Sequence, residues 1–291
     1  QVDVSSYGGG ITSIAVKNGV VAVCVPGIAN EQENGAVVFF DVNGVFQNTV
    51  TVGALPDMIT FTPDGKFILT ADEGQPNDAY TIDPEGSVTM IDISGGIAAL
   101  TQADVTTVGF SQFNSQAADL KAAGVRLLFA ASTVAQDFEP EYVSVAPDGK
   151  KAWVTLQENN AIAELDIENK TFTAVWPLGT KDYSAFGNGL DLSDQSGIVH
   201  IANYPVKGFY LPDALTNYTA GGVTYLVSAN EGDEKELTGL NERSTVSAIT
   251  LDSVAFPNAQ VLRENHNMGR FRISNLQGDT DGDGDFDELY C

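Results

Sequence analysis

The chain has 291 residues, of which 43% are hydrophobic and 18% are charged, and this balance excludes general disorder. Its 39 acidic residues against 14 basic ones give a formal net charge of −25. This charge argues against nucleic acid and anionic membranes as partners, because both require a basic surface, whereas bound divalent cations would relieve the repulsion among the carboxylates.

Four hairpin patterns recur along the chain, and each consists of two short runs of alternating apolar residues around a turn. They span residues 8–25, 55–74, 139–159 and 211–232. Turns such as Asn18-Gly19 and Pro63-Asp64-Gly65-Lys66 are typical of tight hairpins. Further strands are predicted at residues 36–41, 47–52, 87–93, 161–167 and 172–177. Four successive antiparallel strands form one blade of a β-propeller, so the sequence predicts an all-β propeller.

The spacing between the repeats exceeds one blade of about 40–50 residues, so we expect insertions. Residues 113–128 have a helical pattern, which predicts a short helical insertion at residues 110–135. The Gly- and aromatic-rich stretch 183–210 is predicted to be a long surface loop. The repeats account for about four blades and part of another, whereas closed propellers have roughly 4–8 blades. We therefore expect residues 1–291 to form a single propeller domain that is a fragment or shares strands with another subunit.

The sequence D-T-D-G-D-G-D-F-D-E at residues 279–288 places carboxylates at alternate positions around a central glycine. Such a turn surrounds one centre with oxygen atoms, which hard cations such as Ca²⁺ prefer as ligands. Tyr290 stands where an EF-hand has glutamate, so the pattern is more similar to the short calcium loops of integrin-type propeller blades. The candidate calcium ligands are Asp279, Asp281, Asp283, Asp285 (through its backbone carbonyl), Asp287 and Glu288. The alternative interpretation is a solvated acidic turn.

A second set of acidic residues comes from three of the four hairpins, at residues 55–74, 139–159 and 211–232, because each of these has one acid after its proline and another near the end of its second strand. The two ends of an antiparallel hairpin lie at the same edge, so a radial arrangement would bring six carboxylates to one rim of the central channel. These are Asp57, Glu73, Glu141, Glu158, Asp213 and Glu231. At that distance they would raise one another's pKa values or bind a cation. The alternative is that they cap turns by accepting backbone hydrogen bonds.

Few residues suggest catalysis. His200 and His266 lack metal-ligand spacing, and the chain has no nucleophile elbow, phosphate-binding loop or dinucleotide-binding glycine motif. Four arginines between residues 243 and 272 could hold a phosphate, although pairing with nearby acids is favoured. The two cysteines, Cys24 and Cys291, are too few for a disulfide framework, and no apolar run reaches the length of a membrane span.

The chain also contains several long, distinctive motifs, which are spread between residues 50 and 290. They are V-T-V-G-A-L-P-D-M-I-T-F-T-P-D-G-K, T-A-D-E-G-Q-P-N-D-A-Y, W-V-T-L-Q-E-N-N-A-I-A, L-V-S-A-N-E-G-D and G-D-T-D-G-D-G-D-F-D-E-L-Y. These motifs resemble the choice-of-anchor I family, also described as mesenchyme-specific cell-surface glycoprotein-like. The resemblance implies a secreted or cell-surface protein with about seven blades, and some relatives are described as alkaline-phosphatase-like or phytase-like. Unlike those relatives, the chain lacks the first blade strands and stops at Cys291, which implies that closure needs further strands.

The leading hypothesis is a secreted or cell-surface, calcium-binding β-propeller that acts as a binding, matrix or self-assembling module. Its partners would be calcium and copies of itself or other surface proteins, because an unfinished propeller exposes strand edges that another chain can pair. The alternative hypothesis is a calcium-dependent phosphoester hydrolase, in which the rim carboxylates hold ions that position phosphate and activate water. The lack of a clear basic cluster disfavours this alternative, so no catalytic residue is assigned.

Overall fold

The computed structural model describes residues 1–291, which divide into two compact units. The first unit comprises residues 1–178 and 211–231, and the second comprises residues 179–210 and 232–291. This division was not expected from the sequence, in which the repeats suggested one domain.

The first unit contains three four-stranded antiparallel sheets, each formed by four consecutive strands. The first sheet contains β1 (Ser13–Lys17), β2 (Val20–Val25), β3 (Asn34–Asp41) and β4 (Phe46–Ala54). The second contains β5 (Pro56–Phe61), β6 (Phe67–Asp72), β7 (Ser87–Asp92) and β8 (Val105–Gly109). The third contains β9 (Pro140–Val145), β10 (Lys151–Leu156), β11 (Ala161–Asp166) and β12 (Thr171–Pro177). A fourth, two-stranded sheet contains β15 (Pro212–Ala220) and β16 (Val223–Asn230).

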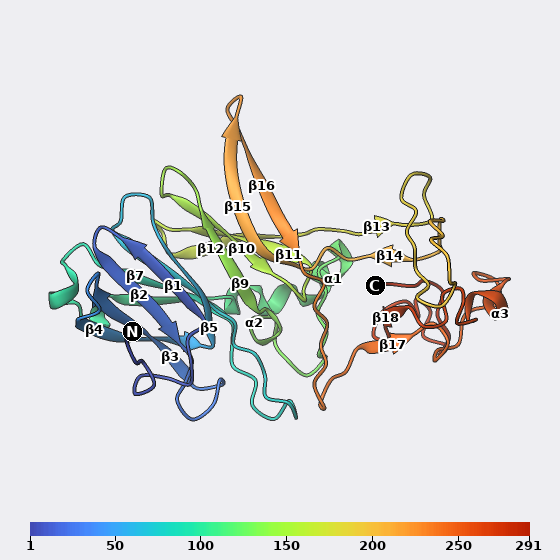
Figure 1. Ribbon diagram of the computed structural model, residues 1–291, viewed down its shortest axis with the longest axis horizontal. Coiled ribbons are helices and arrows are strands. Elements are labelled where there is room, and N and C mark those ends of the chain that lie inside the picture. Colours follow the sequence, from blue (N-terminus) through green and yellow to red (C-terminus); the bar gives the residue numbers. More distant parts are fainter. The chain divides into compact units, whose positions relative to one another are not determined.

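The four sheets are arranged around a common line through their first strands. Strand β1 contacts β5, β5 contacts β9, and β9 contacts β15. Figure 1 shows the sheets in chain order, from blue through green, with the orange β15–β16 hairpin beside the third sheet. Four-stranded meanders that meet along their first strands are the blades of a propeller, so the predicted all-β propeller fold is confirmed.

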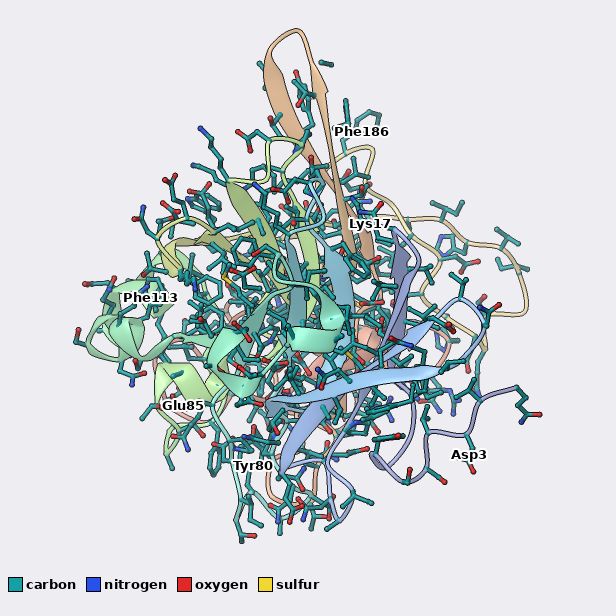
Figure 2. The ribbon with its side chains drawn as sticks, turned by 90° about the vertical axis from the view of Figure 1, so that its left-hand side faces the viewer. Asp3, Lys17, Tyr80, Glu85, Phe113 and Phe186 are labelled. Atoms are coloured by element: carbon teal, nitrogen blue, oxygen red, sulfur yellow. The ribbon has the colours of Figure 1, made fainter.

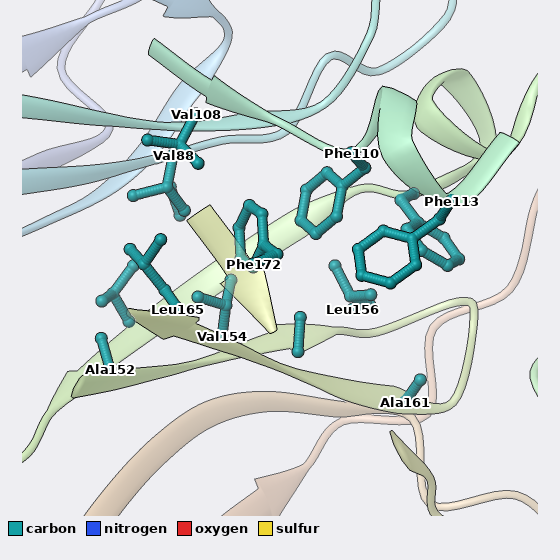
Figure 3. Packing of buried hydrophobic residues seen from close by; sticks show 14 of the residues in the cluster. Val88, Val108, Phe110, Phe113, Ala152, Val154, Leu156, Ala161, Leu165 and Phe172 are labelled. Carbon is teal, nitrogen blue, oxygen red and sulfur yellow. The ribbon is translucent and has the colours of Figure 1, made fainter. Parts of the chain in front are cut away.

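The second sheet is buried on both faces, because its strands carry apolar residues at successive positions. On β6, Ile68 packs toward the first sheet beside Phe39, whereas Leu69 packs toward the third sheet. Successive side chains of a strand point to opposite faces, so this blade contributes to two cores. In the core between the second and third sheets, Phe110 stacks on Phe172 with 3.9 Å between ring centroids (Figure 3).

The expected helical insertion lies between the second and third sheets. It contains a 3-10 helix at Ser111–Gln116, followed by α1 (Ala117–Ala123) and α2 (Val134–Asp137). Two shorter 3-10 helices, Ile97–Ala99 and Gln102–Asp104, precede β8. The first α-helix ends before residue 128, where the sequence pattern had extended it, because Gly124 adopts a left-handed conformation with φ 103° and caps the helix.

The second unit has little regular structure. Strand β13 (Lys181–Asp182) pairs with β14 (Lys207–Gly208), β17 (Arg243–Thr245) pairs with β18 (Arg272–Ser274), and α3 spans Ala259–Leu262. This unit has its own apolar core, which includes Met268 and Ile273. The predicted surface loop belongs to it, and the ring of Phe186 on that loop is fully exposed (Figure 2). Across the chain, no helix has both the length and the apolar character needed to cross a membrane.

Candidate functional site

The three acidic hairpins share one register, which places their acids at the same edge of each blade. The proline at the start of the first strand is paired with a residue at the end of the second strand. These pairs are Pro56 with Asp72, Pro140 with Leu156, and Pro212 with Asn230. The acid that follows each proline and the glutamate that follows the second strand therefore lie close together in each hairpin.

A β-bulge follows each of these prolines. The pairing shifts by one residue between Pro56 and Met58, and equivalent shifts occur after Pro140 and Pro212. An extra, unpaired residue bends the strand and redirects its side chain, and such bulges are frequent next to functional sites. Here the shifted segments contain Asp57, Glu141 and Asp213. The apolar alternation of these strands gave no signal for the bulges, so the sequence did not predict them.

Two of the prolines follow a leucine in the left-handed region, where a residue with a branched side chain is strained. Leu55 has φ 48° and Leu211 has φ 39°. The carbonyl of Leu55 accepts a hydrogen bond from the backbone N–H of Glu73 at 2.9 Å, and that of Leu211 accepts one from Glu231 at 3.2 Å. The strained corner therefore fixes the glutamate of each pair against the start of its own hairpin.

The structure brings Asp57, Glu73 and Glu141 into one cluster. One carboxylate oxygen from each lies within 4.8 Å of the other two. Glu73 and Glu141 are buried, and Asp57 is partly buried. Burial, followed by the negative charges of Glu73 and Glu158, raises the pKa of Glu141 far above its usual range. We call Asp57, Glu73 and Glu141 the inner cluster.

The other three rim acids lie around the inner cluster. Glu158 is buried and acts on Glu141 through its charge. Burial, followed by the charges of Asp213 and Glu231, raises the pKa of Asp57. Glu158 is therefore close enough to act on Glu141, and Asp213 and Glu231 are close enough to act on Asp57, but only Asp57, Glu73 and Glu141 are gathered within 4.8 Å. The side chains of Asp57 and Glu141 accept no backbone hydrogen bond, so turn capping does not describe these two acids.

The acidic loop at residues 279–288 belongs to the second unit and is folded around its own backbone. Oxygens of Asp279, Asp281 and Asp283 lie within 4.8 Å of one another, and all three residues are exposed. Asp279 accepts hydrogen bonds from the backbone N–H groups of Gly282 at 2.7 Å and Gly284 at 3.1 Å. Both glycines have positive φ, which permits the tight turn that gathers the carboxylates.

The remaining loop acids have different surroundings. Asp287 accepts hydrogen bonds from the backbone N–H and hydroxyl of Thr280, at 2.8 and 2.7 Å, and so closes the loop. Slight burial, followed by the charge of Asp283, raises the pKa of Asp285. Glu288 is not one of the three gathered aspartates. Its carboxylate forms an ion pair with Lys207 at 2.6 Å and accepts a hydrogen bond from the Tyr290 hydroxyl.

The arginines of the second unit are engaged with acids or backbone. Arg243 pairs with Glu234 and Glu236, and Arg270 makes a bidentate contact with Asp194 at 3.0 to 3.2 Å. The sequence analysis favoured such pairing of the arginines with acids over a phosphate-binding site. Cys24 and Cys291 are both free thiols.

The model of one protein family, the choice-of-anchor I domain, matches residues 1–291. The chain belongs to this family. The match covers the acidic hairpins and the terminal loop of this choice-of-anchor I domain, so both candidate sites lie within the region that defines the family. No match was found among curated protein sequences.

Solved structures similar to this choice-of-anchor I domain include propellers. The β-propeller domain of Cps50 (Swd1) from Myceliophteria thermophila is 8% identical, with a TM-score of 0.35, and the match covers 57% of this chain and 40% of that one. The WD40 repeats of RRP9 are 7% identical, with a TM-score of 0.34 and coverages of 57% and 38%. Hydrazine synthase from Kuenenia stuttgartiensis is 13% identical, with a TM-score of 0.39 and coverages of 76% and 58%. The chain spans less than two thirds of the length of each.

Proposed function

We propose that the chain is a calcium-binding propeller module of a secreted or cell-surface protein, and that the loop at residues 279–288 binds the ion. The observation that carries this proposal is the approach of Asp279, Asp281 and Asp283, whose carboxylate oxygens lie within 4.8 Å of one another. Two oxygens on opposite sides of a calcium ion are about 5 Å apart, so this spacing is compatible with a shared ion.

Charge and family membership support the same function. The formal net charge of −25 favours binding of divalent cations over binding of anionic partners. Choice-of-anchor domains are associated with anchoring at the cell surface, where free calcium is plentiful enough for an exposed loop of modest affinity. An exposed site without a rigid cage suits a module that is stabilised by calcium outside the cell.

The fourth blade supports a role in binding other β-sheet proteins or copies of the same chain. Its sheet contains only β15 and β16, so one edge of β16 has no strand partner within the sheet. Tyr218 and Tyr225 stack on each other at 5.2 Å between ring centroids, and both are exposed. Unpaired strand edges beside exposed aromatic residues are suited to pairing with a further strand.

Calorimetric titration with Ca²⁺ tests the loop. The double variant Asp281→Asn with Asp283→Asn should lose one bound calcium per chain, because two of the three gathered carboxylates are neutralised. The control carries Asp64→Asn and Asp148→Asn, which remove the same charge from two exposed hairpin turns and should retain the calcium. Equal stoichiometry and affinity in both double variants would exclude the loop as the site.

The phosphoester hydrolase is the less favoured candidate, because the arginines of the second unit are engaged by acids or backbone. We expect no release of phosphate from a phosphomonoester, with or without calcium. If the chain did release phosphate in a calcium-dependent way, and Glu158→Gln or Glu231→Gln abolished this activity, the phosphoester hydrolase would be the supported function and the binding module would not.

A further inference from the structure

The inner cluster contains a buried carboxylate for which the protein provides no partner. Glu141 is only 9% exposed, and its side chain accepts no hydrogen bond and forms no ion pair. Asp72 shows how this fold can satisfy a buried carboxylate. It accepts hydrogen bonds from the hydroxyls of Thr70, Ser87 and Thr89 at 2.5 to 2.9 Å.

An unsatisfied buried carboxylate is costly, and its neighbours here increase the cost. The groups with the largest effect on Glu141 after burial are Glu73, Glu158, Asp57 and Glu139, which are all acidic. Like charges in a site of low polarity either share protons or are neutralised by a cation. The number of acids alone would not indicate a ligand. The lack of a partner for the Glu141 side chain is a separate observation, and it indicates that a cation completes the cluster.

The ligand set favours calcium. The three oxygens lie within 4.8 Å of one another, which is close enough to share one ion, and magnesium usually keeps several waters and is held by only one or two carboxylates. All three ligands are carboxylates, which suit a hard cation rather than zinc or copper. Their backbone segments are fixed by the bulges and by the bond from Glu73 to Leu55.

We propose that Asp57, Glu73 and Glu141 form a buried calcium site that joins the second and third blades. Asp57 lies on β5 and Glu73 follows β6, so the second blade supplies two ligands, and Glu141 on β9 supplies the third. An ion shared by two blades couples their unfolding, because separating the blades breaks its coordination. The site is distinct from the terminal loop, and the inference does not rest on the function proposed for that loop.

The test uses the full chain in the Asp281→Asn, Asp283→Asn background, so that calcium at the terminal loop does not contribute. Adding Ca²⁺ should raise the temperature of unfolding of this protein, and calorimetry should detect one bound ion. Glu141→Gln should weaken that binding by at least about 10- to 100-fold, the range seen when only a supporting partner of a metal ligand is lost. Glu168→Gln, at an exposed turn of the third blade, is the matched control and should bind as tightly as the background protein.

Without calcium, we expect the opposite order of unfolding temperatures for Glu141→Gln and the background protein. In chelator, Glu141→Gln should unfold at a higher temperature than the background protein, because the amide keeps the shape of the side chain and places no ionisable group among the surrounding acids. Glu73→Gln serves as a second variant should Glu141→Gln fail to fold. The proposal is overturned if Glu141→Gln and Glu73→Gln both retain the calcium-induced shift. It is also overturned if Mg²⁺ or Mn²⁺ saturates the site and Ca²⁺ does not, or if no ion binds.

Discussion

Replacing Asp72 with asparagine should remove a pH dependence from the stability of the first unit. Asp72 is fully buried at the end of β6, and burial raises its pKa from 3.8 to about 6 even though three hydroxyls donate to it. A carboxyl group with a raised pKa binds its proton more tightly in the folded state than in the unfolded state. Its contribution to stability is therefore fully present below pH 3.8 and is lost as the pH rises to about 6.

The size of this effect follows from the two pKa values. At about 1.36 kcal/mol per pKa unit, the difference between 3.8 and about 6 corresponds to about 3 kcal/mol at neutral pH. Asp72→Asn cannot ionise, so we expect the variant to match the wild type near pH 4 and to exceed its free energy of unfolding by up to about 3 kcal/mol near pH 8. Urea denaturation followed by circular dichroism, in the presence of EDTA, measures both proteins across this range.

The control is a variant of Asp92, an acid whose pKa is lowered rather than raised in the folded protein. Hydrogen bonds from Ser94 lower the pKa of Asp92, so this acid contributes stability above pH 3.8 that is lost as the pH falls through its lower folded value. Asp92→Asn should therefore be somewhat less stable than the wild type at neutral pH. If the difference between wild type and Asp72→Asn were constant with pH, or grew toward low pH, the assignment of a raised pKa to Asp72 would be refuted.

Two further predictions concern packing, and urea denaturation checks both. Phe110→Ala should lower the free energy of unfolding by about 3–5 kcal/mol, because its ring is fully buried, whereas Phe186→Ala should change it by less than about 0.5 kcal/mol. Equal effects would contradict the assigned core. Gly86→Ala should cost about 1–3 kcal/mol, because its Cβ would lie 2.0 Å from the Phe138 carbonyl oxygen. Gly95→Ala, which meets no atom within 4 Å, should be nearly neutral, and a harmless Gly86→Ala would show that the backbone yields there.

The strands were largely predictable because their signals are local. Turns such as Asn18-Gly19 require positive φ, and the apolar alternation on either side identifies the paired strands. The short strand β8 was missed, since its sequence Val105–Gly109 is brief and follows two 3-10 helices rather than a tight turn. The division into two units was also missed, because no change in composition marks residues 178 and 231.

The candidate sites were predictable only in part. Hairpin register was enough to pair Asp57 with Glu73, because both ends of one hairpin meet at one edge. The sequence could not show that Glu141, rather than Asp213, completes the inner cluster, because that depends on the angle between neighbouring blades. The sequence also could not show that Glu288 forms an ion pair with Lys207, a residue far away in the chain.

The consecutive pairing of strands has a consequence for how the chain acquires its fold. In each of the first three sheets every strand joins its immediate predecessor, so the contacts close over short loops and lose little chain entropy. Such a sheet can form as soon as its last strand leaves the ribosome, and the next can grow against its exposed face. The fourth blade is different, because residues 179–210 separate β12 from β15. Its hairpin therefore has to wait for that long segment and is expected to join the propeller last.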